Sequence, residues 1–248
     1  MDIYGLIGYP LGHSFSRNFF NDKFEAEGID AEYVNFEIPS IDEFKSVVKN
    51  NPALKGLNVT IPYKEQVIPF LDSITNNAKL IGAVNVVVFE RSKNKVKLVG
   101  HNSDIIGFKN SIEPMLKPHH KKALILGTGG SAKAVYYGLQ QLGVEAVCVS
   151  RTKSSGNEIT YADLLPEVIE ERTVIVNCTP VGMWPNVDDC PNIPYHYLTE
   201  NHLLYDLLYN PDETMFMKQG KRYGAETKNG LEMLILQAFA SWEAWQKG

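Results

Sequence analysis

Residues 123–153 read ALILGTGGSAKAVYYGLQQLGVEAVCVSRTK, which combines two short apolar runs, a glycine-rich turn and a helical pattern. The runs 123–126 and 146–149 are typical of buried strands, and the pattern over 133–142 is typical of a helix that ends at Gly143. Strand, turn, helix and strand in this order predict a βαβ unit with two parallel strands.

The glycine-rich turn fits the dinucleotide-binding pattern G-x-G-x-x-G/A, with Gly127, Gly129 and Ala132 at its three fixed positions. The first glycine allows a tight turn, the second lets the backbone approach a pyrophosphate, and the small third residue lets the helix pack closely on the strand. The helix N-terminus offers free N–H groups and a partial positive charge. An ordinary glycine turn is the alternative, but the flanking strands and helix favour a phosphate loop made of Gly127, Thr128, Gly129, Gly130, Ser131 and Ala132.

The end of the second strand indicates which dinucleotide binds. NAD sites carry an Asp or Glu there, which hydrogen-bonds the ribose hydroxyls. This chain has Ser150-Arg151-Thr152-Lys153 instead, with no acidic residue. A guanidinium binds a 2′-phosphate through paired hydrogen bonds, and a nearby ammonium adds positive charge. The sequence therefore predicts NADP(H), with a solvated basic turn as the alternative.

The composition is that of a globular protein with one large domain or two modest ones, over 248 residues. Its net charge of −5 argues against general nucleic-acid binding. No apolar run approaches a membrane span, and the N-terminus shows no signal-peptide pattern. The three cysteines, Cys148, Cys178 and Cys190, show no metal-ligand spacing. We therefore expect a cytoplasmic, reduced protein with no structural metal.

Two serines lie in a loop that precedes a helix. Ser14 and Ser16 follow Gly12, and Ser16 is expected to cap a helix that begins near Arg17. The two hydroxyls have either this structural role alone or a second role as a binding site for a carboxylate.

A lysine lies at the end of an expected strand. The alternation of Leu57, Val59 and Ile61 predicts a strand that directs Asn58 and Thr60 to its other face and ends at Pro62. Lys64 then begins a helix expected to run to about Leu71. Ligands of α/β proteins bind at strand ends, although a lone lysine there is ordinarily a solvated charge.

Two further polar residues interrupt apolar surroundings. Asn85 lies inside the apolar strand expected over 82–89, where a buried amide needs a backbone or ligand partner. Asp104 follows a hairpin that turns at 92–95, and begins the helix expected over 105–116. It either caps that helix or faces a site as a buried carboxylate.

The chain is expected to end in a helix over 231–245. Its apolar stripe consists of Leu231, Leu234, Ile235, Ala238, Trp242 and Trp245. Met233, Leu236 and Phe239 make the first turns apolar almost all round, which predicts a well-buried helix. Gln237 lies among them and needs hydrogen-bond partners.

Taken together, these segments resemble the biosynthetic, NADP-dependent shikimate dehydrogenase family over essentially the whole chain. Residues 12–16 resemble the family's G-H-S-x-S loop, residues 58–64 resemble N-V-T-x-P-x-K, and residues 82–85 match G-A-V-N. Residues 102–104 resemble N-T-D, and residues 206–211 resemble D-x-x-Y-N-P. Each motif alone is modest, but the ordered set is specific.

The resemblance implies an α/β protein with two domains separated by a cleft. An N-terminal αβα substrate-binding domain would comprise residues 1–101 and the final helix, 231–248. A Rossmann-type NADP-binding domain with a parallel sheet would comprise residues 102–230.

The resemblance also implies reversible reduction of 3-dehydroshikimate to shikimate by NADPH, a step toward chorismate and the aromatic amino acids. Lys64 and Asp104 would be the catalytic pair. The substrate carboxylate and hydroxyls would meet Ser14, Ser16, Thr60, Asn85, Tyr209 and Gln237. The nicotinamide would lie near Met183, Leu207 and Gly230.

Some positions depart from the family pattern. Ser103 replaces the family's threonine, Ile105 replaces a glycine, and Asn76 falls where an acidic residue is common, so no role is assigned to it. The segment 153–161 is shortened, which bears on the adenosine pocket.

Two alternatives remain open from the sequence. One is a quinate/shikimate dehydrogenase with broader use of substrates and cofactors. The other is a non-catalytic NADP-binding sensor, against which the presence of both Lys64 and Asp104 argues. The protein is expected to be a monomer or a homodimer that binds a small molecule, and neither nucleic acid nor membrane.

Overall fold

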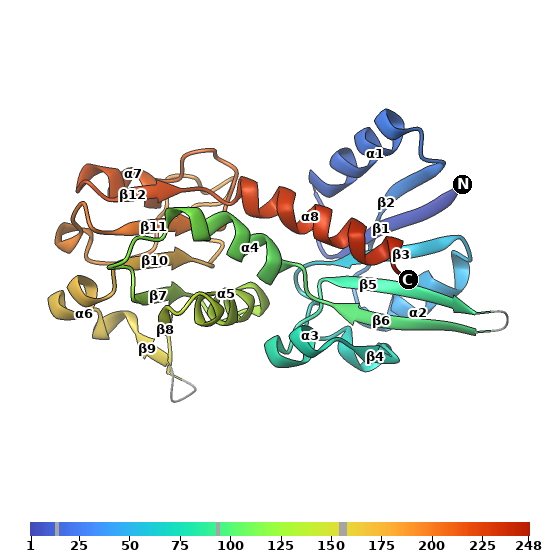
Figure 1. The fold of residues 1–248 in the computed structure, drawn as a ribbon, viewed down its shortest axis with the longest axis horizontal. Coiled ribbons are helices and arrows are strands. Elements are labelled where there is room, and N and C mark those ends of the chain that lie inside the picture. Colours follow the sequence, from blue (N-terminus) through green and yellow to red (C-terminus); the bar gives the residue numbers. More distant parts are fainter. Residues whose placement is uncertain (13–14, 93–94, 154–157) are drawn as a thin grey trace. The chain divides into compact units, whose positions relative to one another are not determined.

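A computed structural model describes residues 1–12, 15–92, 95–153 and 158–248. The chain divides into two compact units, each with its own six-stranded sheet (Figure 1). The first unit comprises Met1–Ser103 and Ala238–Gly248, and the second comprises Asp104–Gln237. The α/β class expected from the sequence is confirmed.

The first unit has a mixed sheet in the strand order β2-β1-β3-β5-β6-β4. Strand β1 pairs in parallel with β2 and β3, whereas β5 pairs antiparallel with β3 and β6. The strands are β1 (Asp2–Gly8), β2 (Ala31–Glu37), β3 (Leu54–Val59), β4 (Ser73–Ile74), β5 (Val86–Ser92) and β6 (Lys95–His101). The helices are α1 (Phe15–Glu27), α2 (Phe44–Asn50), α3 (Asn76–Ile81) and the end of α8 (Leu231–Gln246), with short 3₁₀ turns at Ile41–Glu43 and Ile68–Phe70.

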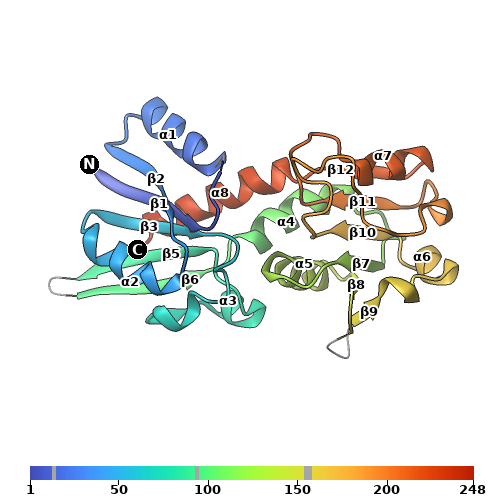
Figure 2. The ribbon, with the colours of Figure 1, turned by 180° about the vertical axis from the view of Figure 1, so that it is seen from behind.

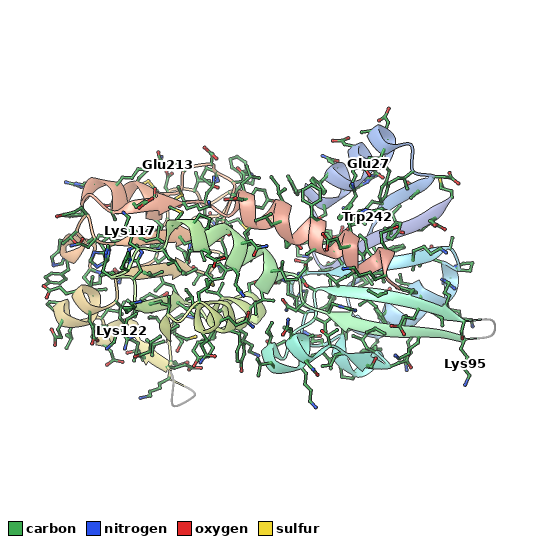
Figure 3. All side chains as sticks on the ribbon, in the orientation of Figure 1. Glu27, Lys95, Lys117, Lys122, Glu213 and Trp242 are labelled. Atoms are coloured by element: carbon green, nitrogen blue, oxygen red, sulfur yellow. The ribbon has the colours of Figure 1, made fainter. Side chains whose placement is uncertain are left out.

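Helices cover both faces of this sheet. Because side chains alternate along a strand, Val86 and Val88 of β5 pack with α1 and α8, whereas Val87 and Phe89 pack on the opposite face with α2. The α8 face is rich in aromatic rings. Trp242 of α8, labelled in Figure 3, lies with its ring centroid 5.4 Å from those of Tyr4 and Phe24.

The second unit has a parallel sheet in the order β12-β11-β10-β7-β8-β9 (Figure 2). Numbered from β7, this is the 3-2-1-4-5-6 order of a dinucleotide-binding fold, which reverses between β7 and β10. The strands are β7 (Lys122–Leu126), β8 (Glu145–Ser150), β9 (Glu158–Thr160), β10 (Val174–Asn177), β11 (Leu203–Asp206) and β12 (Glu226–Lys228). The helices are α4 (Asp104–Ile112), α5 (Gly130–Gln141), α6 (Pro166–Glu171), α7 (Met215–Arg222) and the start of α8, with 3₁₀ turns at Glu113–Met115, Tyr161–Asp163 and Tyr195–Tyr197.

Several expected boundaries differ from the observed ones. Helix α1 begins at Phe15, so Ser16 lies in its first turn rather than at its cap. The helix expected from Lys64 to Leu71 is wrong: the chain forms turns there and a 3₁₀ turn at Ile68–Phe70, whose Pro69 has no N–H to donate. Asn85 lies immediately before β5, not inside a strand.

The final helix also differs from its expected pattern. Leu231 and Phe239 are exposed, so the helix is not buried all round its first turns. Its most buried positions are Met233, Ala238, Ser241 and Trp245, and the polar Ser241 is fully buried among them. The division between the two compact units falls inside α8, after Gln237. The N-terminal part belongs with the second unit because a Cβ at Gly107 of α4 would lie only 2.6 Å from the Met233 carbonyl oxygen.

A buried carboxylate holds together two loops at the carboxyl edge of the parallel sheet. Asp206, at the end of β11, accepts hydrogen bonds from the Thr214 hydroxyl (2.6 Å), the Asn177 amide (3.0 Å) and the Leu208 N–H (3.1 Å). Asn177, at the end of β10, in turn accepts from the N–H and hydroxyl of Thr179. Burial raises the pKa of Asp206 to about 6, although these three donors favour its ionised form.

We expect Asp206 to make stability depend on pH. Its folded-state pKa lies above its unfolded value near 3.8, so its contribution is complete below about pH 4 and is lost as pH rises through 6. A pKa difference of about two between the folded and unfolded states corresponds to about 3 kcal/mol in the free energy of unfolding. Relative to Asp206→Asn, the wild-type free energy of unfolding should therefore fall by roughly that amount between pH 4 and 7, measured by urea denaturation. Parallel pH curves for the two proteins would contradict this assignment.

Candidate functional site

The turn that carries Lys64 is fixed to the first sheet at several points. The Thr60 N–H donates to the Ile7 carbonyl (2.9 Å), and the Tyr63 N–H donates to the Thr60 carbonyl (2.9 Å). The buried Tyr63 hydroxyl donates to the Ile38 carbonyl at 2.6 Å. The Val84 N–H donates to the Lys64 carbonyl at 2.7 Å. These hydrogen bonds hold the backbone of Lys64 just beyond the carboxyl end of β3. The Lys64 residue itself is half-buried.

Asn85 is held from every side by backbone and side-chain groups. Its N–H donates to the His101 carbonyl (3.1 Å), and its own carbonyl accepts from the Val59 N–H (2.9 Å). Its side-chain Oδ1 accepts from the Ser103 N–H at 2.7 Å, and its Nδ2 donates to Ser103 Oγ at 3.0 Å. Because a backbone N–H can only donate, Oδ1 must face Ser103 N, which fixes the orientation of the amide.

A second buried amide extends these contacts to the final helix. Asn58 Nδ2 donates to the Asn85 carbonyl (3.2 Å) and to Ser241 Oγ (3.0 Å), and Ser241 Oγ lies 3.1 Å from Ser103 Oγ. The Tyr33 hydroxyl donates to Asn58 Oδ1 at 2.8 Å. All five side chains are buried and belong to the first unit. We call Tyr33, Asn58, Asn85, Ser103 and Ser241 the buried polar chain.

Ser16 lies at the other end of this chain. Burial raises the pKa of the Tyr33 phenol well above its usual value, and a hydrogen bond with the Ser16 side chain opposes that shift. The Tyr33 hydroxyl donates its own hydrogen bond to Asn58 Oδ1. In the hydrogen bond with Ser16, the Ser16 hydroxyl is therefore the donor and the Tyr33 oxygen the acceptor. Two predicted substrate residues, Ser16 and Asn85, are thus connected through buried side chains. Ser14 lies outside the described residues.

Asp104 and Gln237 lie in the second unit. Asp104 is the first residue of α4 and is 5% exposed, whereas Gln237 is half-buried on α8 and donates to the Leu234 carbonyl at 3.0 Å. The expectation that Asp104 meets Lys64 stays a prediction. Tyr209 follows β11 and is 37% exposed.

The glycine-rich turn has room for a bound phosphate. Gly127 has φ of 109°, which only glycine adopts readily, and its N–H donates to the Val149 carbonyl (2.9 Å). Gly129 caps α5 without a side chain, and a Cβ built on it would meet no atom within 4 Å. Ala132 is 1% exposed in the core beneath, as expected of a small residue between helix and strand. Thr128, Gly130 and Ser131 complete the turn and the first residues of the helix.

The basic segment lies where the sequence placed it, directly after β8. Ser150 ends the strand, and its hydroxyl donates to the Thr152 carbonyl at 2.6 Å. Arg151, Thr152 and Lys153 are exposed. The residues therefore fit an NADP-type dinucleotide: a glycine turn with free space lies at one strand end, where the pyrophosphate would bind, and two exposed cations lie at the next, where the 2′-phosphate would bind.

The three residues predicted near the nicotinamide lie on loops of the second unit. Gly230 packs against Leu207: a Cβ at Gly230 would lie 2.1 Å from the Leu207 carbonyl oxygen, so only glycine fits. The Gly230 N–H also donates to the Leu208 carbonyl at 2.9 Å. Met183 is 47% exposed on the loop after β10, which Asn177 and Asp206 tie to β11.

Sequence reasoning missed four members of the buried polar chain: Tyr33, Asn58, Ser103 and Ser241. The signal for Ser241 was a serine at helical spacing from Ala238 and Trp245, on the stripe that packs against the sheet. Ser103, noted as a departure from the family's threonine, keeps the hydroxyl that the observed contacts require.

Within the described residues, no helix is long and apolar enough to cross a membrane. The same residues contain no group of three His, Cys, Asp or Glu side chains placed to hold a metal ion.

The chain resembles known proteins over almost its full length. Residues 6–87 match the family model for the shikimate dehydrogenase substrate binding domain. The NADP(+) shikimate dehydrogenase of Carboxydothermus hydrogenoformans is 37% identical over 97% of this chain and 90% of its own length.

Solved structures agree with the sequence comparison. A shikimate dehydrogenase crystallised with NADP+ is 32% identical and has a TM-score of 0.86, covering 100% of this chain and 90% of that one. The Thermus thermophilus enzyme in complex with NADP(H) and shikimate is 28% identical, with a TM-score of 0.86 and coverage of 100% and 94%. By sequence and by fold, this chain belongs to the shikimate dehydrogenase family.

Proposed function

We propose that this protein catalyses the reversible NADPH-dependent reduction of 3-dehydroshikimate to shikimate, on the route to chorismate and the aromatic amino acids. The observation that carries the proposal is the firm placement of Lys64 and Asn85 at one edge of the first sheet. The Val84 N–H that holds the Lys64 carbonyl belongs to the residue just before Asn85. A candidate proton donor and a candidate ligand for hydroxyls are thereby fixed in one unit.

The roles of the side chains follow from the groups they offer. Lys64 gives a proton to the alkoxide that develops on the substrate ring, with Asp104 as its partner. Ser14 and Ser16 hold the carboxylate. Hydroxyls of the ring are bound by amide, hydroxyl and phenol groups, supplied by Thr60, Asn85, Tyr209 and Gln237.

The second unit holds the cofactor. NADPH, when bound, supplies the hydride that reduces the ring ketone. Backbone N–H groups from Gly127 to Ala132 bind the pyrophosphate, and the side chains from Ser150 to Lys153 bind the 2′-phosphate. Met183, Leu207 and Gly230 shape the nicotinamide pocket.

We also propose that the protein acts in the cytoplasm, as a monomer or homodimer, without nucleic acid. Its three cysteines are all free thiols, which fits a reducing compartment. A net charge of −5 is unfavourable for contact with a polyanion.

The direct test of the reaction follows the absorbance of NADPH in a mixture of purified protein, shikimate and NADP+. We expect NADPH to accumulate, and much more slowly with NAD+, because no acidic residue follows β8 to bind an unphosphorylated ribose. The Arg151→Ala variant should narrow that preference. Turnover with quinate and NAD+ at equal efficiency would favour the broader dehydrogenase, and the absence of turnover would refute the proposal.

Loss of the proton donor should slow chemistry more than binding. For Lys64→Ala we expect kcat to fall roughly 10²- to 10⁴-fold, with KM for shikimate changed only a few-fold, measured by steady-state kinetics. Lys97→Ala removes an exposed lysine of β6 that pairs with Glu90, and serves as the control with unchanged kinetics. A raised KM with kcat preserved would make Lys64 a binding residue instead.

A further inference from the structure

The buried polar chain includes four side chains to which the proposed function assigns no role. Tyr33, Asn58, Ser103 and Ser241 come from β2, β3, the residue before α4, and α8. Asn58 and Ser103 contact Asn85 directly, Tyr33 and Ser241 contact it through them, and all four are at most 6% exposed. Four segments remote in the sequence therefore place polar groups at one buried point.

Packing alone does not require polar groups at this point. The surrounding core on the α8 face is apolar and aromatic, with Tyr4, Phe20, Phe24 and Trp245 among its members. Buried polar groups contribute little net stability over well-packed apolar side chains, and they cost free energy when any partner is missing. Both Asn58 Nδ2 hydrogens and its Oδ1 have partners here, so the arrangement specifies one geometry.

That geometry converges on the Asn85 amide. Ser103 contacts both ends of the amide, through its N–H at 2.7 Å and its Oγ at 3.0 Å. Ser241 holds Ser103 Oγ from the helix side at 3.1 Å, and Asn58 holds Ser241 at 3.0 Å. Asn58 also donates to the Asn85 carbonyl, so one amide group fixes the backbone of Asn85 and, through Ser241, the Ser103 hydroxyl that contacts the Asn85 side chain.

We propose that Ser241, with Asn58 and Ser103, is a positioning residue that holds the Asn85 amide ready to bind a hydroxyl of the substrate. The inference rests on the proposed function and names residues that act through Asn85 rather than on the substrate directly. Tyr33 completes the set because it binds Asn58 Oδ1 and connects to Ser16, the candidate carboxylate ligand.

The test compares two buried serines by steady-state kinetics and by calorimetric titration with shikimate. Ser241→Ala should raise KM and Kd for shikimate about 3- to 10-fold, as expected for one mispositioned hydrogen bond, with KM for NADP+ unchanged. The matched control is Ser111→Ala. Ser111 is also fully buried, and its hydroxyl lies 2.6 Å from the Tyr205 hydroxyl, within the second unit. This variant should lose comparable thermal stability without a change in shikimate affinity.

A double-mutant cycle shows whether Ser241 acts through Asn85. In an Asn85→Ala background, Ser241→Ala should have no further effect on shikimate affinity, because its target is gone. Ser241→Thr, which keeps the hydroxyl, should restore part of the affinity that Ser241→Ala loses.

The possible failures are distinguishable. Wild-type protein that turns over shikimate, together with Ser241→Ala that loses stability but keeps its KM, would overturn the positioning role alone. Additive effects in the double-mutant cycle would overturn it as well. Wild-type protein without turnover and without shikimate binding would refute the proposed function and this inference with it.

Discussion

The hydrogen bonds made by Asn58 are the contacts on which the geometry around Asn85 depends. The Asn58 side-chain nitrogen donates to the Asn85 carbonyl and to the Ser241 hydroxyl, while the Asn58 side-chain oxygen accepts a hydrogen bond from the Tyr33 hydroxyl. The sheet, the segment before β5 and the final helix are thereby joined through a single side chain. Since the alternatives are unpaired polar groups in an apolar core, the geometry around Asn85 is strongly specified.

In the second unit, the corresponding constraint is the arrangement of strand ends in the parallel sheet. Its parallel sheet gathers strand ends at one edge, and in the glycine turn after β7 a Cβ at Gly129 would meet no atom within 4 Å. Asp206 and Asn177 fasten the neighbouring loops, so the segments that carry Met183 and Leu207 share one buried anchor.

Local patterns were sufficient to predict much of this architecture. The strand–turn–helix–strand unit predicted over residues 123–153 was confirmed. Its apolar runs, its glycines and its helical pattern follow one another in the order that a βαβ unit requires. The predicted hairpin was also confirmed, since β5 and β6 pair antiparallel. The prediction of a helix from Lys64 to Leu71 was wrong. The segment follows Pro62 and contains Pro69, and the contacts of Tyr63 and Val84 hold it in turns.

The buried polar chain could not be read from local patterns. Its hydrogen-bonded partners lie up to 183 positions apart in the sequence, and each residue alone looks like an ordinary strand or helix residue. Ser241 shows the difficulty: helical spacing placed it on the stripe that packs against the sheet, but only the fold supplies Asn58 and Ser103 as its partners.

We infer above all that Asn85, held by the buried polar chain, contacts the substrate. A crystal structure of the protein with shikimate bound tests it most directly. We expect a ring hydroxyl within hydrogen-bonding distance of Asn85 Nδ2, while the contacts of Asn85 with Ser103 and of Ser103 with Ser241 are retained. Shikimate bound elsewhere, or an Asn85 side chain turned away from Ser103, would contradict it.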